Sequence, residues 1–98
     1  MTVVRLTDSL RKVVTTTLHE LCTEDKDVMW DLNMQWDEEI ESHPHIYLWI
    51  SIDQPDDLRV EIWAKQQLPY ATEENVEAMV RESWERLTIE EMELRLLQ

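Results

Sequence analysis

The apolar residues near the start of the chain recur every three or four positions. This spacing places them on one face of an amphipathic helix, so the sequence predicts a helix over residues 6–23. Thr7 or Asp8 is positioned to cap its first turn. The β-branched run between Val13 and Thr17 lowers the helix propensity of its middle. The predicted apolar stripe consists of Leu6, Leu10, Val13, Thr17 and Leu21, widened by Val14, Leu18 and Cys22.

Further along the chain the period of the pattern changes to two. Apolar and polar residues alternate over residues 28–36, 45–52 and 58–66, which is typical of β-strands with one buried face. The even-numbered positions of these strands form an apolar sheet face that can receive helices. Its twelve members are Trp30, Leu32, Met34, Trp36, Ile46, Leu48, Ile50, Ile52, Leu58, Val60, Ile62 and Ala64.

The connection between the second and third strands predicts how they pair. Residues 53–57 read DQPDD, a five-residue hairpin loop in which Pro55 is placed to begin a type I turn. Symmetric closure of this loop would put Tyr47 opposite Trp63, with Trp49 one step away on the diagonal. The three rings would then lie together on the odd-numbered face of the sheet.

The last quarter of the chain returns to helical spacing. Thr72 is predicted to cap a helix over residues 73–87. The four residues from Thr88 to Glu91 match a capping box, which favours a second helix from that point to the end of the chain. One bent helix over residues 73–97 is the alternative.

Together these elements predict a single domain over residues 1–98. Adjacent antiparallel strands with helices at both ends indicate an α+β fold. We expect an N-terminal helix, a three-stranded antiparallel meander sheet, and one or two C-terminal helices packed on one sheet face. A chain of 98 residues buries only about two-thirds of its unfolded surface, so this core is small.

Composition excludes several classes of function. The chain has no glycine, so phosphate-binding P-loops, dinucleotide loops and nucleophile elbows are excluded. It has one cysteine, and no apolar run is long enough to span a bilayer or act as a signal peptide. We therefore expect a cytoplasmic protein without an internal disulfide or a membrane segment.

Few residues suggest catalysis or metal binding. His19 and Cys22 share a helix face, and His43 and His45 flank Pro44, so the two pairs lie on separate elements. With no second cysteine, they do not make a convincing zinc site. Carboxylates are plentiful, but none falls in a predicted apolar pocket that would raise its pKa. We expect no metal, no cofactor and no enzymatic activity.

The charge changes this picture more than any motif does. The chain carries 22 acidic and 9 basic residues, a net charge of -13, which disfavours direct binding to a nucleic-acid backbone. In the C-terminal helix, acid-before-base pairs at i,i+4 account for part of this excess. These pairs are Glu77–Arg81, Glu82–Arg86 and Glu91–Arg95. Residues 24–57 hold eleven acidic residues against Lys26 alone, without such pairing.

Two interpretations of this acidic middle segment remain open. It can keep loops and an edge strand solvated. Alternatively, it can recognise a positively charged partner, because alternate strand residues lie about 6.6 Å apart and rows of carboxylates can then substitute for DNA phosphates. The candidate residues are Asp31, Asp37, Glu38, Glu39, Glu41, Asp53, Asp56 and Asp57.

The aromatic residues Tyr47, Trp49 and Trp63 on the predicted odd-numbered face also have two interpretations. They can be cross-strand pairs that stabilise the sheet by about 0.2–1 kcal/mol. They can equally anchor a protein-binding or dimer surface, since rigid aromatic residues with a polar tip are typical of interfaces.

The sequence thus suggests a small acidic protein that binds and inhibits a partner with a basic surface. A nuclease or a DNA- or RNA-binding complex would be such a partner, and a phage or mobile-element antagonist of the DNA-mimic type would act in this way. The alternatives are a dimeric chaperone or adaptor, with Trp49 and Trp63 packed across a two-fold axis, and a toxin-immunity protein.

Overall fold

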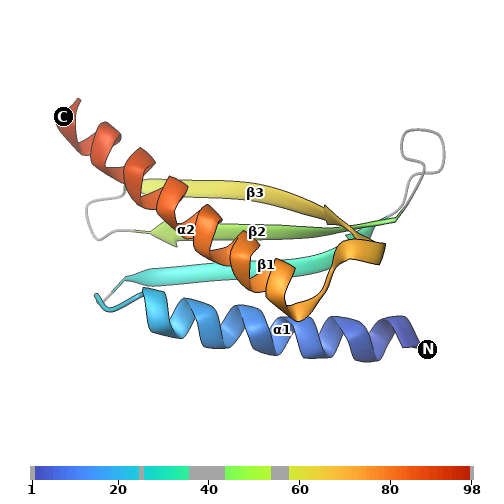
Figure 1. Cartoon of the computed structure of the whole chain (residues 1–98). Coiled ribbons are helices and arrows are strands. Elements are labelled where there is room, and N and C mark those ends of the chain that lie inside the picture. Colours follow the sequence, from blue (N-terminus) through green and yellow to red (C-terminus); the bar gives the residue numbers. More distant parts are fainter. Residues whose placement is uncertain (1, 25, 36–43, 54–57, 98) are drawn as a thin grey trace.

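The computed structural model describes residues 2–24, 26–35, 44–53 and 58–97. The chain forms a three-stranded sheet, and a helix lies at each end of the chain (Figure 1). In chain order the elements are α1 (Thr2–Leu21), β1 (Asp27–Gln35), β2 (His45–Asp53), β3 (Arg59–Gln67), the 3₁₀ turn η1 (Leu68–Tyr70) and α2 (Glu73–Leu96).

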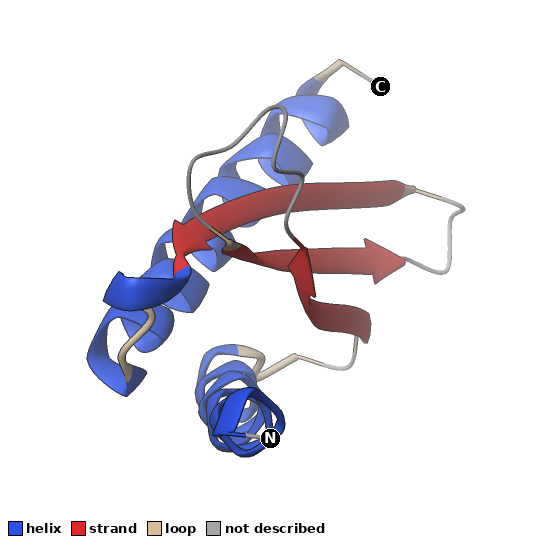
Figure 2. Cartoon of the chain, turned by 90° about the vertical axis from the view of Figure 1, so that its right-hand side faces the viewer, coloured by secondary structure: helices blue, strands red, loops and turns tan. Residues whose placement is uncertain are grey.

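The molecule has two layers. The antiparallel strands lie in the order β1-β2-β3, so β2 is central and β1 and β3 are the edges. Both helices lie on the same side of the sheet, α1 alongside β1 and α2 diagonally across β2 and β3 (Figure 1 and Figure 2). The predicted α+β fold with its meander sheet is confirmed.

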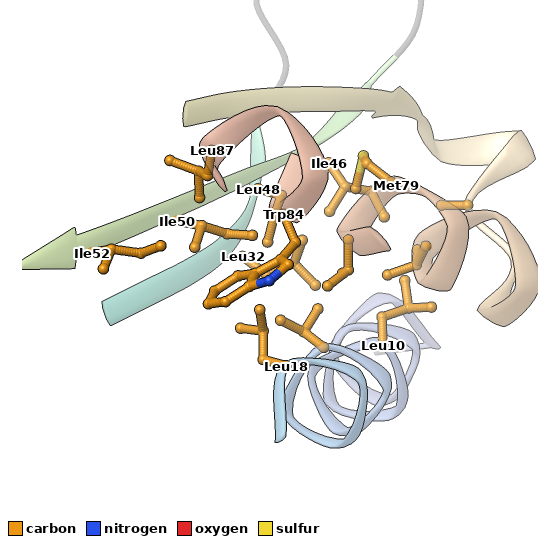
Figure 3. Close-up of a cluster of buried hydrophobic side chains, with 14 of the residues drawn as sticks. Leu10, Leu18, Leu32, Ile46, Leu48, Ile50, Ile52, Met79, Trp84 and Leu87 are labelled. Carbon is orange, nitrogen blue, oxygen red and sulfur yellow. The ribbon is translucent and has the colours of Figure 1, made fainter. Parts of the chain in front are cut away.

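The core fills the space between the helices and the even-numbered face of the sheet. Trp84 of α2 belongs to the same cluster as Leu18 of α1 and Ile50 of β2 (Figure 3). The alternation in the sequence selected this face correctly, because one face of a half-buried strand must be apolar. Its buried strand residues are Leu32, Ile46, Leu48, Ile50, Ile52 and Val60.

The two edge strands, β1 and β3, are less buried than the pattern predicts. Met34, in the last part of edge strand β1, is 41% exposed. Trp30, Ile62 and Ala64 are half-buried against the core. Trp36, predicted to end the first strand on this face, lies outside the described residues.

The predicted boundaries of the first helix are wrong at both ends. The helix begins at Thr2 instead of residue 6 and ends at Leu21. Neither glycine nor proline precedes Thr7, so nothing in the sequence stops the helix from extending past the expected caps.

The C-terminal segment is one helix, so the single-helix alternative holds and the capping box at Thr88–Glu91 is not used. Thr72 caps it as predicted, since its Oγ1 accepts a hydrogen bond from the backbone N–H of Asn75 at 3.1 Å. Thr88 instead donates its hydroxyl to the carbonyl of Glu85 at 2.8 Å, inside the helix. A threonine bonded to the preceding turn is compatible with an uninterrupted helix.

The pairing of β2 with β3 differs from the prediction by two residues. Tyr47 lies opposite Lys65, and Trp49 lies opposite Trp63. The shift arises because β2 ends one residue later than predicted, at Asp53, and β3 begins one residue later than predicted, at Arg59. These two residues pair beside the loop. A shift of two leaves every side chain on its predicted face, so the apolar pattern could not distinguish the two registers.

An ion-pair network holds the last turns of α2 against the segment that follows α1. Lys26 Nζ lies 3.1 Å from Glu91 Oε2, and Arg95 Nε lies 3.4 Å from Glu91 Oε1. Burial by itself would lower the pKa of Lys26, but hydrogen bonds and attraction from Glu91 and Glu24 outweigh it and raise that pKa. Glu91 is thus a buried carboxylate with cationic partners on both sides.

Candidate protein-binding surface

The odd-numbered residues of β1, β2 and β3 form the sheet face turned away from the two helices, here called the odd face. Near its middle, Trp49 and Trp63 occupy directly opposed positions on β2 and β3. Their ring centroids are 6.1 Å apart and their planes are tilted by 37°. This tilted geometry is favourable for aromatic pairs. Trp49 is half-buried, whereas Trp63 is 64% exposed.

Charged neighbours hold the indole of Trp49 in place. Its Nε1 donates a hydrogen bond to Glu61 Oε2 at 2.9 Å. The guanidinium of Arg59 lies 6.0 Å from the ring centroid, and Arg59 Nε donates to Ser51 Oγ at 3.1 Å. Because Trp49 is held on two sides, its ring is fixed in position where it contacts the exposed ring of Trp63.

Tyr47 does not take the place that the sequence suggested. It lies opposite Lys65, and its ring contacts His45 with centroids 6.3 Å apart. The structure therefore brings together Trp49 and Trp63, with Tyr47 two residues along β2 from the pair, half-buried beside His45.

Asp31 is the first of the two candidate carboxylates within the described residues, and it is occupied by local partners. Its Oδ1 lies 3.2 Å from Arg11 Nη2, and its Oδ2 accepts a hydrogen bond from the amide of Asn33. Burial would raise the pKa of Asp31, but hydrogen bonds from Asn33, Arg11 and the Leu32 N–H, together with the charge of Arg11, lower it. Asp31 is thus ionised and already neutralised within the chain.

Arg11 also binds the edge of the sheet. It donates to the backbone carbonyl of Leu32, and its guanidinium lies 5.8 Å from the ring centroid of Trp30. One side chain of α1 therefore contacts a carboxylate, a carbonyl and an indole of edge strand β1.

Asp53 is the second described carboxylate among the candidates. Its Oδ1 lies 3.5 Å from Arg59 Nε, at the end where β2 and β3 first pair. The other six candidates lie outside the described residues, namely Asp37, Glu38, Glu39, Glu41, Asp56 and Asp57.

Several residues of this surface were not predicted from the sequence as part of a binding site. Glu61, Arg59 and Ser51 position Trp49, and Met29, opposite Ser51 on β1, is 52% exposed on the same face. All are odd-numbered strand residues, so their face was predictable. Their contacts were not, because these depend on the register that the sequence left undetermined by two residues.

A groove of about 460 Å³ runs beside Trp63, between edge strand β3 and the first half of α2. Lys65 and Arg86 line it together with Glu82 and Asn75. It is an open, polar groove along the edge of the sheet, next to the exposed indole.

Among the described candidates for metal binding, His19 and Cys22 belong to α1 and the residue after it, and His45 belongs to β2, while His43 lies outside the described residues. His19 is exposed, and the Cys22 thiol lies 3.4 Å from the carbonyl of Glu24. Within the described ranges, no three histidine, cysteine or acidic side chains gather in a way that could hold a metal ion. Neither α1 nor α2, over their described residues, has the length and apolar character needed to cross a membrane.

Comparison with known proteins does not place the chain in a family. No family model, curated protein or solved structure matches it. The geometry of its own residues is therefore the basis for a functional proposal.

Proposed function

We propose that this chain is a non-enzymatic protein that binds and inhibits another protein, with Trp63 as the anchor and a basic surface on the partner. The observation that carries this proposal is the exposed indole of Trp63 on the fixed ring of Trp49. Trp is enriched among the few interface residues that dominate binding energy.

The way the pair is held supports a binding role. An anchor that is already ordered in the free protein loses little side-chain entropy when the complex forms. Trp49 is fixed by Glu61 and by Arg59, so the ring that supports Trp63 is ordered before any partner arrives. A purely stabilising pair would not require one of its two rings to remain two-thirds in water.

The charge supports a basic partner. A net charge of -13 attracts a cationic protein over about a Debye length and raises the association rate at low salt. An acidic protein seated on the basic surface of a nuclease or a DNA- or RNA-binding complex would exclude nucleic acid from it, which is the basis for proposing inhibition.

Strict DNA mimicry receives less support than anchoring by tryptophan. Mimicry needs rows of carboxylates that are free to replace phosphates. The two described candidates, Asp31 and Asp53, are instead paired with Arg11 and Arg59. In the proposed complex, Trp63 therefore provides the affinity, and the overall charge of the chain steers the partner toward it.

The test compares two equally exposed aromatic residues. Binding to a panel of purified basic nucleic-acid-binding proteins is measured by calorimetry at about 50 and 300 mM salt, with Trp63→Ala as the variant and Tyr70→Ala as the control. Tyr70, in η1, is 60% exposed, close to the value for Trp63.

We expect the wild-type chain to bind at least one member of the panel and to displace its nucleic acid. The Trp63→Ala variant should bind about 30-fold more weakly, as loss of a 2 kcal/mol anchor requires. The Tyr70→Ala variant should bind as the wild type does. Equal weakening by both substitutions, or binding that salt does not affect, would contradict the proposal.

A further inference from the structure

Helix α2 carries apolar side chains on two opposite sides. One side is buried against the sheet and α1, and its large apolar members are Val76, Met79, Val80, Trp84 and Leu87. The other side, near the C-terminal end, presents Ile89, Met92 and Leu96 to solvent, with exposed fractions of 49%, 65% and 84%. At 100° per residue these three lie within a narrow arc, here called the outer stripe.

The outer stripe is a local departure from the rest of its helix face. One and two turns earlier the same face carries Glu85 and Glu82, as expected for a solvated side of a surface helix. From residue 89 onward the polar residues on this face give way to large apolar ones. A change of this kind on an exposed helix face marks an interaction surface.

The end of α2 is held in position rather than left to fray. Its last turns extend past the sheet (Figure 1). On the side opposite the outer stripe, Glu91 is bound to Lys26, and Leu94 packs against the core. These contacts keep the stripe turned outward.

Two charged residues flank the outer stripe on the same side. Arg86 and Glu93 are seven residues apart, which is two helical turns, and both are exposed. Neither forms an ion pair within the described part of its own chain, and the expected Glu82–Arg86 pair is not formed. An unpaired cation and an unpaired anion thus border the same apolar stripe.

We propose that two copies of this chain associate through antiparallel pairing of their α2 helices along the outer stripe. In this pairing Ile89 of each copy packs on Met92 of the other. The same alignment brings Arg86 of each copy next to Glu93 of the other, because antiparallel helices reverse the order of the two flanking charges. Two identical apolar contacts and two identical ion pairs result from a single two-fold axis.

The order of these charges favours a second copy over other occupants. A basic helix of a foreign protein would meet the cation of Arg86. A parallel pair of α2 helices would leave Arg86 level with Arg86 and Glu93 level with Glu93, without complementary charge at either level. Of the two arrangements of a second copy, the reversed one alone matches both flanking residues.

The association is expected to be weak. Residues from about 85 to 97 take part, so the buried area is below that of a standard interface, and the two copies repel each other through their net charges of -13. A dissociation constant on the order of 10–100 µM is consistent with such a contact. The contact uses none of the tryptophan residues. A result that disproves the dimer therefore does not disprove the proposed binding function, and the converse also holds.

Sedimentation equilibrium of the full chain over a range of concentrations tests the proposal. The wild type and the Trp63→Ala variant should both dimerise reversibly, and Met92→Glu should be monomeric with an unchanged circular dichroism spectrum. A wild-type chain that stays monomeric up to about 1 mM, well above the expected constant, would overturn the proposal.

Charge exchange provides the sharper experiment. Glu93→Arg and Arg86→Glu should each weaken the dimer about fivefold, because each places like charges together at both ends of the contact. The double variant Arg86→Glu/Glu93→Arg should restore wild-type association. Glu90→Arg is the matched control, since it makes the same charge change off the stripe and should not weaken the dimer. Equal behaviour of Glu93→Arg and Glu90→Arg, or no rescue in the double variant, would overturn the proposal.

Discussion

The ammonium group of Lys26 lies 3.1 Å from Glu91 Oε2, which joins the segment after α1 to the last turns of α2 across 65 residues of sequence. Both side chains are largely buried. We expect Glu91→Ala to lower the free energy of unfolding by about 3 kcal/mol, because it leaves Lys26 with Glu24 as its remaining anion in the network. Urea unfolding monitored by circular dichroism measures this change.

The matched control for that prediction removes both charges. A Lys26→Met/Glu91→Leu variant should be clearly more stable than Glu91→Ala, since it leaves no unpaired buried charge. If the single and double variants were equally unstable, side-chain packing and not the ion pair would explain the loss.

The raised pKa of Lys26 predicts a loss of stability at alkaline pH. The folded pKa lies above the unfolded value of 10.5, so the contribution of Lys26 is complete below about that pH. It is lost as pH rises through the folded pKa. The difference in unfolding free energy between wild type and Lys26→Arg should therefore change in favour of the arginine variant above pH 10.5, because arginine stays charged. A difference that is constant from pH 8 to 11.5 would contradict this.

The lowered pKa of Asp31 predicts the opposite behaviour in acid. Its contribution is present above the unfolded value of 3.8 and is lost as pH falls through the folded pKa. Between pH 5 and 2.5 the wild type should lose more stability than Asp31→Asn does. Parallel curves for the wild type and Asp31→Asn would show that Arg11 and Asn33 do not stabilise the carboxylate.

The contact between Trp49 and Trp63 should be measurable as a coupling energy. A double-mutant cycle with Trp49→Ala and Trp63→Ala is expected to give about 0.5–1 kcal/mol, the usual contribution of an aromatic cross-strand pair. Trp49→Ala should cost more stability than Trp63→Ala, because Trp49 also loses its bond to Glu61. A coupling near zero would mean that the rings touch without stabilising the sheet.

Substitution of leucine by alanine should affect stability very differently on the two sides of α2. Leu87 is fully buried, and Leu87→Ala should destabilise the chain by about 3 kcal/mol through lost burial and a cavity. Leu96 lies on the exposed outer stripe, and Leu96→Ala should change stability by less than about 0.5 kcal/mol. Thermal unfolding at low protein concentration compares the two without interference from dimerisation. A large loss from Leu96→Ala would indicate that the stripe is part of the core.

Alternation was sufficient to assign the faces of the sheet. It placed Leu32 and Ile50 in the core and both Trp49 and Trp63 on the odd face, because the side-chain period of a strand is two. It did not determine the register, since a slip of two residues exposes the same side chains. The tryptophan pair therefore became visible only in the structure.

The electrostatics of the site were less predictable than its apolar pattern. Pairs within a helix follow a fixed spacing, and Glu77–Arg81 and Glu91–Arg95 are formed as the sequence predicts. The ion pairs of Asp31 and Lys26 instead join different elements, with partners 20 and 65 residues away. No local rule identifies such partners, because they depend on how the helices are placed on the sheet.

The hydrogen bond from Arg11 to the Leu32 carbonyl has a consequence for self-assembly. Fibrils grow when each molecule accepts a strand on one border of its sheet and offers its other border to the next molecule. In this protein a guanidinium already occupies a backbone acceptor on the β1 border. A strand added to the β1 border would have to displace this guanidinium from its acceptor, which disfavours growth of the sheet in that direction.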